Sequence, residues 1–368
     1  MSILFLGPLP PPVHGFSAIN AAMLARLEQA GPVTVFNRAL PAQATGARAT
    51  RKAGRALGHW LGLLGGFIAA ASRRPTSVYA GFSGGKGQLL DLPFFVVARL
   101  LGIPTYVHHH SFAYLNQPSR LTGACMKVLS RARHIALCPE MAKAIGATYG
   151  IPQAQLIVLS NAAFLPAMSP PETTPEYHPA RQAIKVGFLS NITAEKGIFE
   201  FFAVLRRAAE AGLAHEAEIA GPVDPGILDR FQAELAALPQ ARHLGPLYGA
   251  DKQRFFQRID LLLFPTRYAN EAEPVTLHEA LQAGATVVAA HRGCIGGMLP
   301  DHCGSAQPAE AFESQAIQTL QELTSLDPAR RLAKRAAIQQ HYQTTAERSE
   351  RTLRQLVQDI SHPSTSSP

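Results

Sequence analysis

Short apolar runs alternate with helically spaced apolar positions along the first half of the chain. Runs that predict strands occupy residues 3–6, 33–36, 77–80, 105–107, 134–137 and 156–159. Between the first two runs, Ile19, Met23 and Leu27 recur every four residues and share one face of a helix, with Ser17 as its expected N-cap. This alternation predicts an α/β domain built on a parallel sheet.

A change of composition separates this half from the next. Five prolines fall between residues 166 and 179, a stretch that is typical of a linker. Strands are then predicted at residues 185–189, 218–220, 261–264 and 286–290, and a helix at 346–360. We therefore expect an N-terminal domain (1–168), a C-terminal domain (169–345) and a terminal helix with a frayed tail (346–368). Open α/β sheets bind ligands at the carboxyl ends of their strands, so we expect the site in a cleft between the halves.

The charge of the chain narrows the classes of partner. Its 368 residues carry a formal net charge of +8, which favours an anionic partner such as a nucleotide phosphate or an acidic membrane face. Aromatic residues make up only 7% and do not interleave with basic ones, so nucleic acid is the least expected partner. The four cysteines form no CxxC pair and no basic leader precedes the first strand, which favours a reduced, cytoplasmic protein.

An apolar segment at residues 57–71 raises the question of membrane contact. It is flanked by basic residues, namely Arg48, Arg51, Lys52 and Arg55 before it and Arg73 and Arg74 after it. As a helix the segment spans about 22 Å, less than the ~30 Å of a bilayer core, so we do not expect it to cross a membrane. Two alternatives stay open: an amphipathic helix on the cytoplasmic face of the inner membrane, or an ordinary domain helix.

The longest motif with candidate chemistry runs from residue 264 to residue 284. A strand ending in Phe264-Pro265 becomes a polar loop that carries Glu271, and a helix opens near Pro274, since proline is favoured in a first helical turn. Glu279 lies within that helix. Free N–H groups at a helix N-terminus bind anions, and nearby carboxylates can accept hydrogen bonds from sugar or ribose hydroxyls.

Two further loops carry groups suited to phosphate. The strand at 185–189 leads through Ser190 and Asn191 to Lys196-Gly197 at a helix start, where the lysine can neutralise a diphosphate together with the helix dipole. After the strand at 286–290, a glycine-rich turn at residues 293–297 contains Cys294 and Ile295, and its backbone N–H groups can hold phosphate.

The N-terminal half offers two features at strand ends. Gly15 follows the first strand, where a glycine lets the backbone approach a ligand closely. His108, His109 and His110 end the strand that begins at residue 105. Because neighbouring strand residues point to opposite faces, only His108 and His110 could share a zinc ion, and no cysteine or acidic residue lies close in sequence. Zinc is therefore the minor alternative to a substrate contact.

The 264–284 string resembles the hallmark of family 4 glycosyltransferases. There, two glutamates at E-x7-E spacing follow a strand ending in Phe-Pro, and the second begins a Glu-Ala-x-x-Ala-Gly run, as Glu279 does here. The resemblance covers residues 183–300 well. In the N-terminal half, only the layout of the elements and the positions of the loops match. It implies the GT-B fold: an α/β protein of two Rossmann-like, doubly wound domains that face a central cleft, with the C-terminal helix returning to the N-terminal domain. It also implies retaining transfer of a sugar from a nucleotide-diphosphate sugar to a hydroxyl acceptor, without a metal or other cofactor. No DxD motif occurs in the chain.

The resemblance also implies roles for single residues in the C-terminal half. Glu271 corresponds to the glutamate that faces the donor sugar, with Glu273 as a rival, and Glu279 to the one that holds the ribose. Lys196 matches the lysine on the diphosphate. Many members carry an arginine just after the strand glycine, where this chain has Phe188.

The remaining implied contacts complete the predicted site. Arg267 can substitute for the missing arginine. Pro274, Cys294, Ile295 and Asn191 fall on loops that border the donor. In the N-terminal half, His110 is the best match for a histidine at the reaction centre, with His108 and His109 as rivals, and Gly15 lies in the loop that approaches the donor phosphate.

Two other functions stay open at this point. One is another GT-B enzyme, such as a nucleotide-sugar epimerase or a phosphorylase. The second is a non-catalytic nucleotide-sugar-binding or interaction protein, which the missing phosphate arginine favours. The basic N-terminal half and its apolar segment favour a lipid-linked or polysaccharide precursor as the acceptor, at the cytoplasmic face of the inner membrane.

Overall fold

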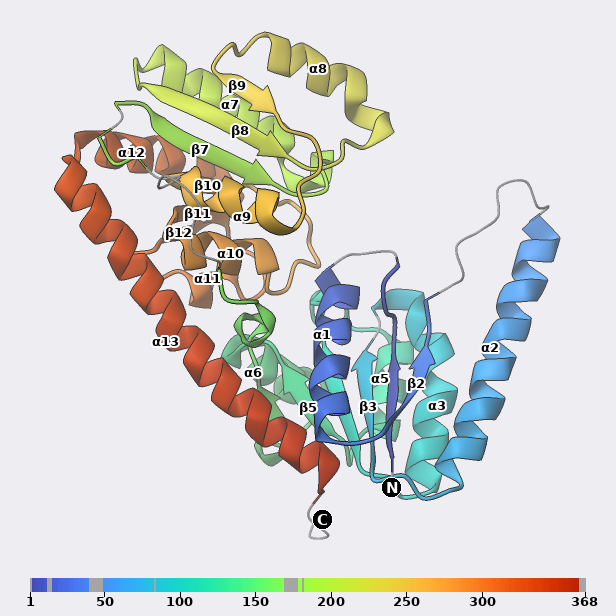
Figure 1. The fold of residues 1–368 in the computed structure, drawn as a ribbon. Coiled ribbons are helices and arrows are strands. Elements are labelled where there is room, and N and C mark those ends of the chain that lie inside the picture. The colour runs from blue at the N-terminus through green and yellow to red at the C-terminus, as the bar shows by residue number, and fades with distance from the viewer. Residues whose placement is uncertain are drawn as a thin grey trace. The chain divides into compact units, whose positions relative to one another are not determined.

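The computed structural model describes residues 2–11, 15–39, 49–82, 84–168, 178–180 and 182–363 (Figure 1). The chain divides into two compact units. Unit 1 consists of Met1–Phe164 together with Arg348–Pro368, and unit 2 of Leu165–Glu347. Much of the predicted proline-rich linker, residues 169–177, and the predicted frayed tail at 364–368 lie outside the described residues.

Unit 1 is built on a six-stranded parallel sheet with the order β2-β1-β3-β4-β5-β6. Its strands are β1 (Ile3–Gly7), β2 (Val33–Asn37), β3 (Ser77–Phe82), β4 (Thr105–His109), β5 (Arg133–Ala136) and β6 (Leu156–Val158). Its helices are α1 (Gly15–Ala30), α2 (Ala49–Ala71), α3 (Gln88–Leu100), α4 (Ala113–Asn116), α5 (Arg120–Val128) and α6 (Pro139–Tyr149), with 3-10 turns η1 (Gly85–Gly87), η2 (Gln153–Gln155) and η3 (Asn161–Phe164).

Alternate residues of β1 supply the two faces of this sheet. Leu4 and Leu6 pack with α2, α3 and α5, whereas Ile3 and Phe5 pack with α1 and the end of the C-terminal helix. Every residue of β1 is buried because helices cover both faces. This explains why the strand reads as a continuous apolar run.

The C-terminal helix α13 (Pro328–Ser361) returns to unit 1. Leu353, Leu356 and Ile360 belong to the core on the α1 face of the sheet. Ser77 Oγ donates a hydrogen bond of 2.7 Å to the carbonyl oxygen of Ile360. The predicted helix start at residue 346 is wrong, because the helix already begins at Pro328, where proline is tolerated, and runs on through unit 2.

Unit 2 has a second six-stranded parallel sheet, with the order β12-β11-β10-β7-β8-β9. Its strands are β7 (Ile184–Leu189), β8 (His215–Ala220), β9 (Ala241–His243), β10 (Leu261–Phe264), β11 (Thr286–Ala290) and β12 (Gly304–Gln307). Its helices are α7 (Ile198–Glu210), α8 (Leu228–Ala236), α9 (Gly249–Arg258), α10 (Val275–Ala283), α11 (Ile295–Met298) and α12 (Phe312–Ser325), with 3-10 turns η4 (Ala194–Lys196), η5 (Pro225–Ile227) and η6 (Ala309–Ala311).

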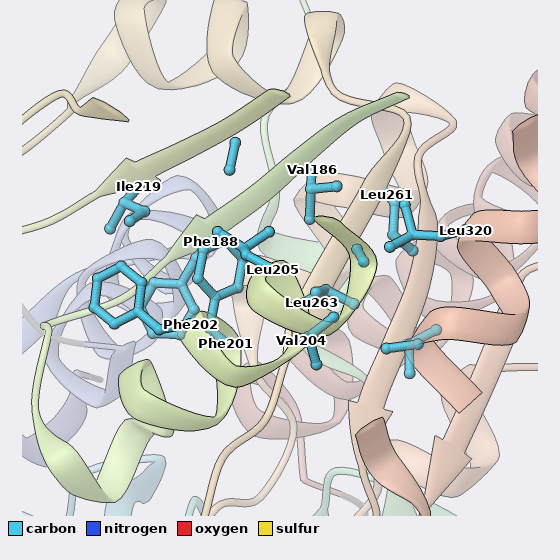
Figure 2. Packing of buried hydrophobic residues seen from close by; sticks show 14 of the residues in the cluster. Val186, Phe188, Phe201, Phe202, Val204, Leu205, Ile219, Leu261, Leu263 and Leu320 are labelled. Atoms are coloured by element: carbon cyan, nitrogen blue, oxygen red, sulfur yellow. The ribbon is translucent and has the colours of Figure 1, made fainter. Parts of the chain in front are cut away.

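Several phenylalanines pack among a larger number of aliphatic side chains in the core on one face of this sheet (Figure 2). Phe188 from β7 contacts Phe201 from α7 with ring centroids 5.3 Å apart, and Phe202 contacts Phe231 from α8 at 5.6 Å. Leu320 from α12 joins the same cluster. On the other face of β7, a Cβ at Gly187 would lie 2.7 Å from Ile259 Cδ1 and 2.9 Å from Phe255 Cζ, so a larger residue there would require these side chains to shift.

Two local predictions differ from the structure. Ser17 is not an N-cap, because α1 already begins at Gly15 and Ser17 is buried inside it. Strands β9 and β12 were not predicted: both are short and only partly buried, so neither forms an apolar run. The apolar segment at residues 57–71 lies in α2, and no helix in the described part of the chain has the length and apolar character needed to cross a bilayer.

Candidate functional site

The strand order of unit 2 indicates where a ligand binds. Strands β8 and β9 follow β7 outward in one direction, whereas β10, β11 and β12 extend in the other. The connections therefore diverge between β7 and β10, and the crevice at the carboxyl ends of two such strands is the usual ligand site of an open α/β sheet. Lys196 lies beyond β7 and Glu271 beyond β10, so these two predicted residues flank this point.

An ion pair joins these two residues. Lys196 Nζ lies 2.5 Å from Glu271 Oε2, and both side chains are largely but not fully shielded, with 25% and 13% exposed. Thr266 Oγ1 donates to the same carboxylate oxygen at 3.3 Å. The ring of Tyr268 lies 4.9 Å from Lys196 Nζ, a cation–π contact. The structure thus brings together a cation and a carboxylate from loops that are far apart in sequence.

Two glycines allow the loops around this pair to approach closely. Gly197, with φ of +84°, lies against Pro265, whose carbonyl oxygen would be 2.0 Å from a Cβ at that position. Gly293, with φ of +50°, lies against the backbone of Glu271 and Ala272 in the same way. The glycine-rich turn after β11 therefore supports the loop that carries Glu271.

Glu279 forms a second ion pair, one that the sequence did not predict. Its Oε1 lies 2.5 Å from Lys252 Nζ of α9, and its enclosed Oε2 has no hydrogen-bond partner among the described residues. Burial raises the pKa of Glu279, and the cation of Lys252 opposes this shift. A buried carboxylate oxygen without a partner is unfavourable, so this atom is available to a hydroxyl donor.

Glu273, the rival of Glu271, has a different environment. It is buried, and its Oε1 lies 3.0 Å from Nε2 of His278, which is buried as well. This contact ties the loop to α10. Because Glu273 is buried against His278 and the carboxylate of Glu271 is partly exposed, Glu271 is favoured as the residue that faces a ligand.

Arg267 and Asn191 lie at the surface of the same loops. Arg267 Nη1 contacts Glu200 Oε1 at 3.1 Å, and its backbone N–H donates to Glu195. Asn191 is exposed, in the loop after β7. A second cation at a diphosphate would therefore require Arg267 to leave Glu200.

The remaining predicted donor contacts are mainly backbone groups. Pro274 is the N-cap of α10, and its carbonyl accepts from Leu277 at 3.1 Å. The N–H of Cys294 donates to Ala272 at 2.8 Å, and that of Ile295 donates to Arg292 at 2.9 Å. In this structure the two N–H groups thus hold the turn together, and a phosphate would have to compete with these carbonyls for them.

In unit 1, the predicted residues gather at the carboxyl ends of β1 and β4. Gly15 is the first residue of α1, and the ring of its neighbour Phe16 lies 4.8 Å from that of His110. Burial lowers the pKa of His110 to about 3, so its imidazole is neutral at physiological pH. His110 Nε2 has no hydrogen-bond partner among the described residues.

The two neighbouring histidines are fully buried, and each binds a tyrosine. His108 Nδ1 lies 2.7 Å from the hydroxyl of Tyr79, and the His108 ring lies 4.0 Å from that of His110, as strand alternation predicts. On the opposite face of the strand, His109 Nδ1 lies 2.7 Å from the Tyr114 hydroxyl. His108 Nε2 also lacks a partner among the described residues, but its ring is fully buried, whereas His110 is partly exposed. This difference in burial favours His110 as the histidine that meets a substrate.

His109 also belongs to a chain of hydrogen bonds whose direction can be worked out. The carbonyl of Leu129 can only accept, so His134 Nε2 donates to it at 3.2 Å. His134 Nδ1 therefore accepts from His109 Nε2 at 3.0 Å, and His109 Nδ1 accepts from the Tyr114 hydroxyl. Burial lowers the pKa of His109 and His134, and both imidazoles are neutral.

Comparison with solved structures places this architecture among known folds. HepE from Anabaena, solved in complex with UDP, matches with a TM-score of 0.69 at 19% identity over 98% of this chain and 100% of that one. Sucrose-phosphate synthase from Thermosynechococcus elongatus matches with a TM-score of 0.70 at 14% identity, and WaaG, a glycosyltransferase involved in lipopolysaccharide biosynthesis, with 0.62 at 12%; each match covers 98% of this chain and 99% of the other. The chain has the GT-B fold. No protein-family model and no curated protein matches its sequence.

The structure of unit 2 also shows contacts of the candidate site residues that the sequence motifs did not reveal. Lys252, Thr266 and Tyr268 contact the predicted carboxylates and lysine. Thr266 and Tyr268 lie inside the motif at residues 264–284, but the spacing of its glutamates did not single them out. Thr266 and Tyr268 lie close to Glu271 in sequence and could have been found from that proximity. Lys252 lies on α9, and only the packing of α9 beside α10 reveals its contact.

Proposed function

We propose that this chain is a retaining glycosyltransferase that moves a sugar from a nucleotide-diphosphate sugar to a hydroxyl acceptor. The observation that carries the proposal is the Lys196–Glu271 ion pair where β7 and β10 diverge. This position lies at the carboxyl ends of the strands, where open α/β sheets bind nucleotides. The structural similarity to HepE, which has been solved with UDP and with UDP-glucose, supports a uridine nucleotide as the first donor to test.

In the proposed reaction, the bond between the anomeric carbon and the diphosphate oxygen breaks. Negative charge accumulates on the leaving diphosphate, and Lys196 is placed to neutralise it. When the donor binds, Lys196 releases Glu271 and contacts the diphosphate instead. The Glu271 carboxylate can then accept hydrogen bonds from the sugar hydroxyls. The acceptor oxygen forms a bond to the anomeric carbon on the face from which the diphosphate leaves. It passes its proton to the departing phosphate.

Glu279 is the proposed ribose contact. Its unpartnered Oε2 can accept a hydrogen bond from a ribose hydroxyl while Lys252 continues to compensate its charge at Oε1. In unit 1, the neutral imidazole of His110 can exchange a hydrogen bond with a substrate hydroxyl without adding a charge. Neither role requires a metal or another cofactor.

The surface of α2 supports a lipid-linked acceptor, or a polysaccharide precursor, presented at a membrane. Leu57, Leu61 and Ile68 fall on one face of α2 within about 40° of one another at 100° per residue, and all three are exposed. Arg73 and Arg74 follow the helix and are exposed as well. We place this face against the anionic cytoplasmic leaflet, where the leucines would enter the interface.

The first test is nucleotide-sugar binding by the purified protein. We expect UDP-glucose, or another nucleotide sugar from a UDP, GDP and ADP panel, to raise the melting temperature. A ligand at 100 times its Kd stabilises a protein by about 2.7 kcal/mol. We expect Glu279→Gln to lose this shift, and Arg254→Gln, which alters an exposed ion pair on α9, to keep it. Absence of binding across the whole panel would refute the proposal.

Product analysis separates the proposal from its rivals. A retained anomer in the product of transfer to a lipid-linked acceptor supports it. Release of an epimerised nucleotide sugar would instead identify an epimerase. Binding without turnover against any acceptor would identify a nucleotide-sugar-binding protein.

A further inference from the structure

A group of metal-ligating side chains lies away from the candidate donor site. His302, Cys303 and His341 each offer one ligand atom, and the three atoms lie within 4.8 Å of one another. His302 and Cys303 precede β12, and His341 lies on α13 within unit 2. Because all strands of this sheet are parallel, the group lies at the amino edge of β12, whereas Lys196 and Glu271 lie beyond carboxyl ends.

The backbone holds Cys303 in place. Its N–H donates to Pro300 at 2.7 Å, and its carbonyl accepts from Val287 of β11 at 3.0 Å. The thiol is free and fully buried. The cysteine therefore lies on a fixed turn, and its sulfur does not depend on a mobile loop for its position.

The segment of α13 that carries His341 is also fixed to unit 2. Arg335 donates to the carbonyls of Ile259 at 3.0 Å and Gln257 at 2.6 Å. Lys334 Nζ donates to the carbonyl of His302 at 3.3 Å, so the helix already contacts the turn beside the ligands. The rings of His302 and His341 lie 5.3 Å apart in an edge-to-face arrangement.

We propose that His302, Cys303 and His341 bind one Zn²⁺ ion, with a fourth position left to water. One thiolate and two imidazoles are ligands that zinc favours in tetrahedral sites. From Zn–S and Zn–N lengths of about 2.3 and 2.0–2.1 Å, neighbouring ligand atoms in such a site lie roughly 3.3–3.6 Å apart. The ligand atoms therefore need to approach one another by at most about 1.5 Å. His302, which is exposed, can turn inward to do so and leaves the metal a route of entry.

Zinc binding would replace the packing contact between the turn before β12 and α13 with metal–ligand bonds. The thiol of Cys303 releases its proton to the solvent as the Zn–S bond forms, and the neutral imidazoles each donate a nitrogen lone pair. The ion then joins the turn before β12 to α13, which continues into unit 1. This role is structural and independent of the proposed glycosyl transfer, since the group lies beyond the amino end of its strand.

Cobalt provides a direct readout of the thiolate. The full-length, tag-free chain is stripped with chelator and titrated with Co²⁺, and we expect one equivalent to produce thiolate-to-cobalt charge-transfer absorption in the near ultraviolet. Cys303→Ser should lose this band. Cys125→Ser, which alters the other free and buried cysteine, is the matched control and should keep it. A band that survives in Cys303→Ser and disappears in Cys125→Ser would overturn the assignment.

Zinc stoichiometry tests the two histidines. We expect one zinc per chain in the parent protein and at least a tenfold weaker affinity in His302→Ala, a substitution at an exposed residue that leaves the core intact. Zinc should raise the melting temperature of the parent and leave that of His302→Ala and His341→Ala unchanged. No zinc bound at micromolar concentration, or unchanged affinity in both variants, would overturn the proposal.

Discussion

A Cβ on Gly293 would lie 2.4 Å from the carbonyl oxygen of Glu271. The two residues follow different strands, β11 and β10, and their backbones are in direct contact. Since Gly293 has a φ of +50°, the position is doubly restricted, by conformation and by space. The geometry of the Glu271 loop therefore depends on a glycine that need not touch a substrate.

We expect Gly293→Ala to displace the Glu271 loop and to weaken nucleotide-sugar binding at least tenfold. Gly212→Ala is the control, since Gly212 also has a positive φ, of +69°, but a Cβ added there would meet no atom within 4 Å. The control therefore carries only the strain of an alanine in the left-handed region, about 1–2 kcal/mol. Isothermal titration with UDP-glucose compares the two. Equal affinities in both variants would show that the contact between these backbones is dispensable.

Lys196→Met should reduce the transfer rate more than it reduces stability. Removing one group that stabilises developing charge costs about 10²–10³ in kcat. The side chain is partly exposed, so the fold should tolerate its loss. Steady-state kinetics give kcat and KM, with Lys143→Met, at an exposed lysine of unit 1, as the control. A kcat within twofold of the parent value would remove Lys196 from the reaction.

Nucleotide binding should become more sensitive to acid when Lys252 is replaced. Burial raises the pKa of Glu279 and Lys252 lowers it, so Lys252→Met should raise that pKa further. The carboxylate accepts hydrogen bonds most strongly when ionised, and affinity should therefore fall at a higher pH than in the parent protein. Titrations of UDP binding between pH 5 and 8, about the range in which a raised carboxyl pKa acts, measure the shift. Superimposable profiles would contradict the coupling.

Unit 1 should lose stability in mild acid. His109 and His134 are neutral when folded, and burial lowers the pKa of His134 from 6.5 to about 4. In the unfolded chain both take up a proton near pH 6.5, so the unfolded state binds more protons and the free energy of unfolding falls as pH drops below that value. Each histidine lowers the free energy of unfolding by up to about 1.4 kcal/mol per pH unit as the pH falls.

Urea unfolding followed by Trp60, which lies in unit 1, measures this pH dependence. His134→Gln removes one titrating group and should reduce the slope between pH 6.5 and pH 5, about the interval in which the unfolded histidines become charged. A slope that is the same in the variant and the parent would show that His134 does not control the acid response.

The sequence predicted the buried strands well for a physical reason. Parallel strands covered on both faces are continuous apolar runs, so β1, β7, β10 and β11 were evident from hydrophobicity. The edge strands β9 (Ala-Arg-His) and β12 (Gly-Ser-Ala-Gln) are not apolar runs and were missed, whereas the edge strands β2 and β6 are apolar in sequence and were predicted. The length of α13 was also missed, because its mean composition is polar and only its last turns enter the core of unit 1.

The candidate site was predicted only where a motif lies on one loop or helix. The spacing of Glu271 and Glu279 identified both carboxylates as candidates. Their lysine partners depend on how separate elements pack: Lys196 meets Glu271 because β7 and β10 are neighbours, and Lys252 meets Glu279 because α9 lies beside α10. The His302–Cys303–His341 group was not predicted from the sequence, because its members also come from separate elements: His341 lies on α13.

Because α13 ends in unit 1, the order of synthesis constrains folding. Residues up to Phe164 leave the ribosome first, but Leu353, Leu356 and Ile360 cover one face of their sheet together with α1. The carbonyl of Ile360 also accepts a hydrogen bond from the hydroxyl of Ser77. Unit 2, by contrast, is continuous in sequence and complete once Glu347 has emerged. Unit 1, most of which is made before unit 2, is thus completed only after residues 348–361 have emerged, and until then part of the α1 face of its sheet lacks its apolar cover and is open to chaperones.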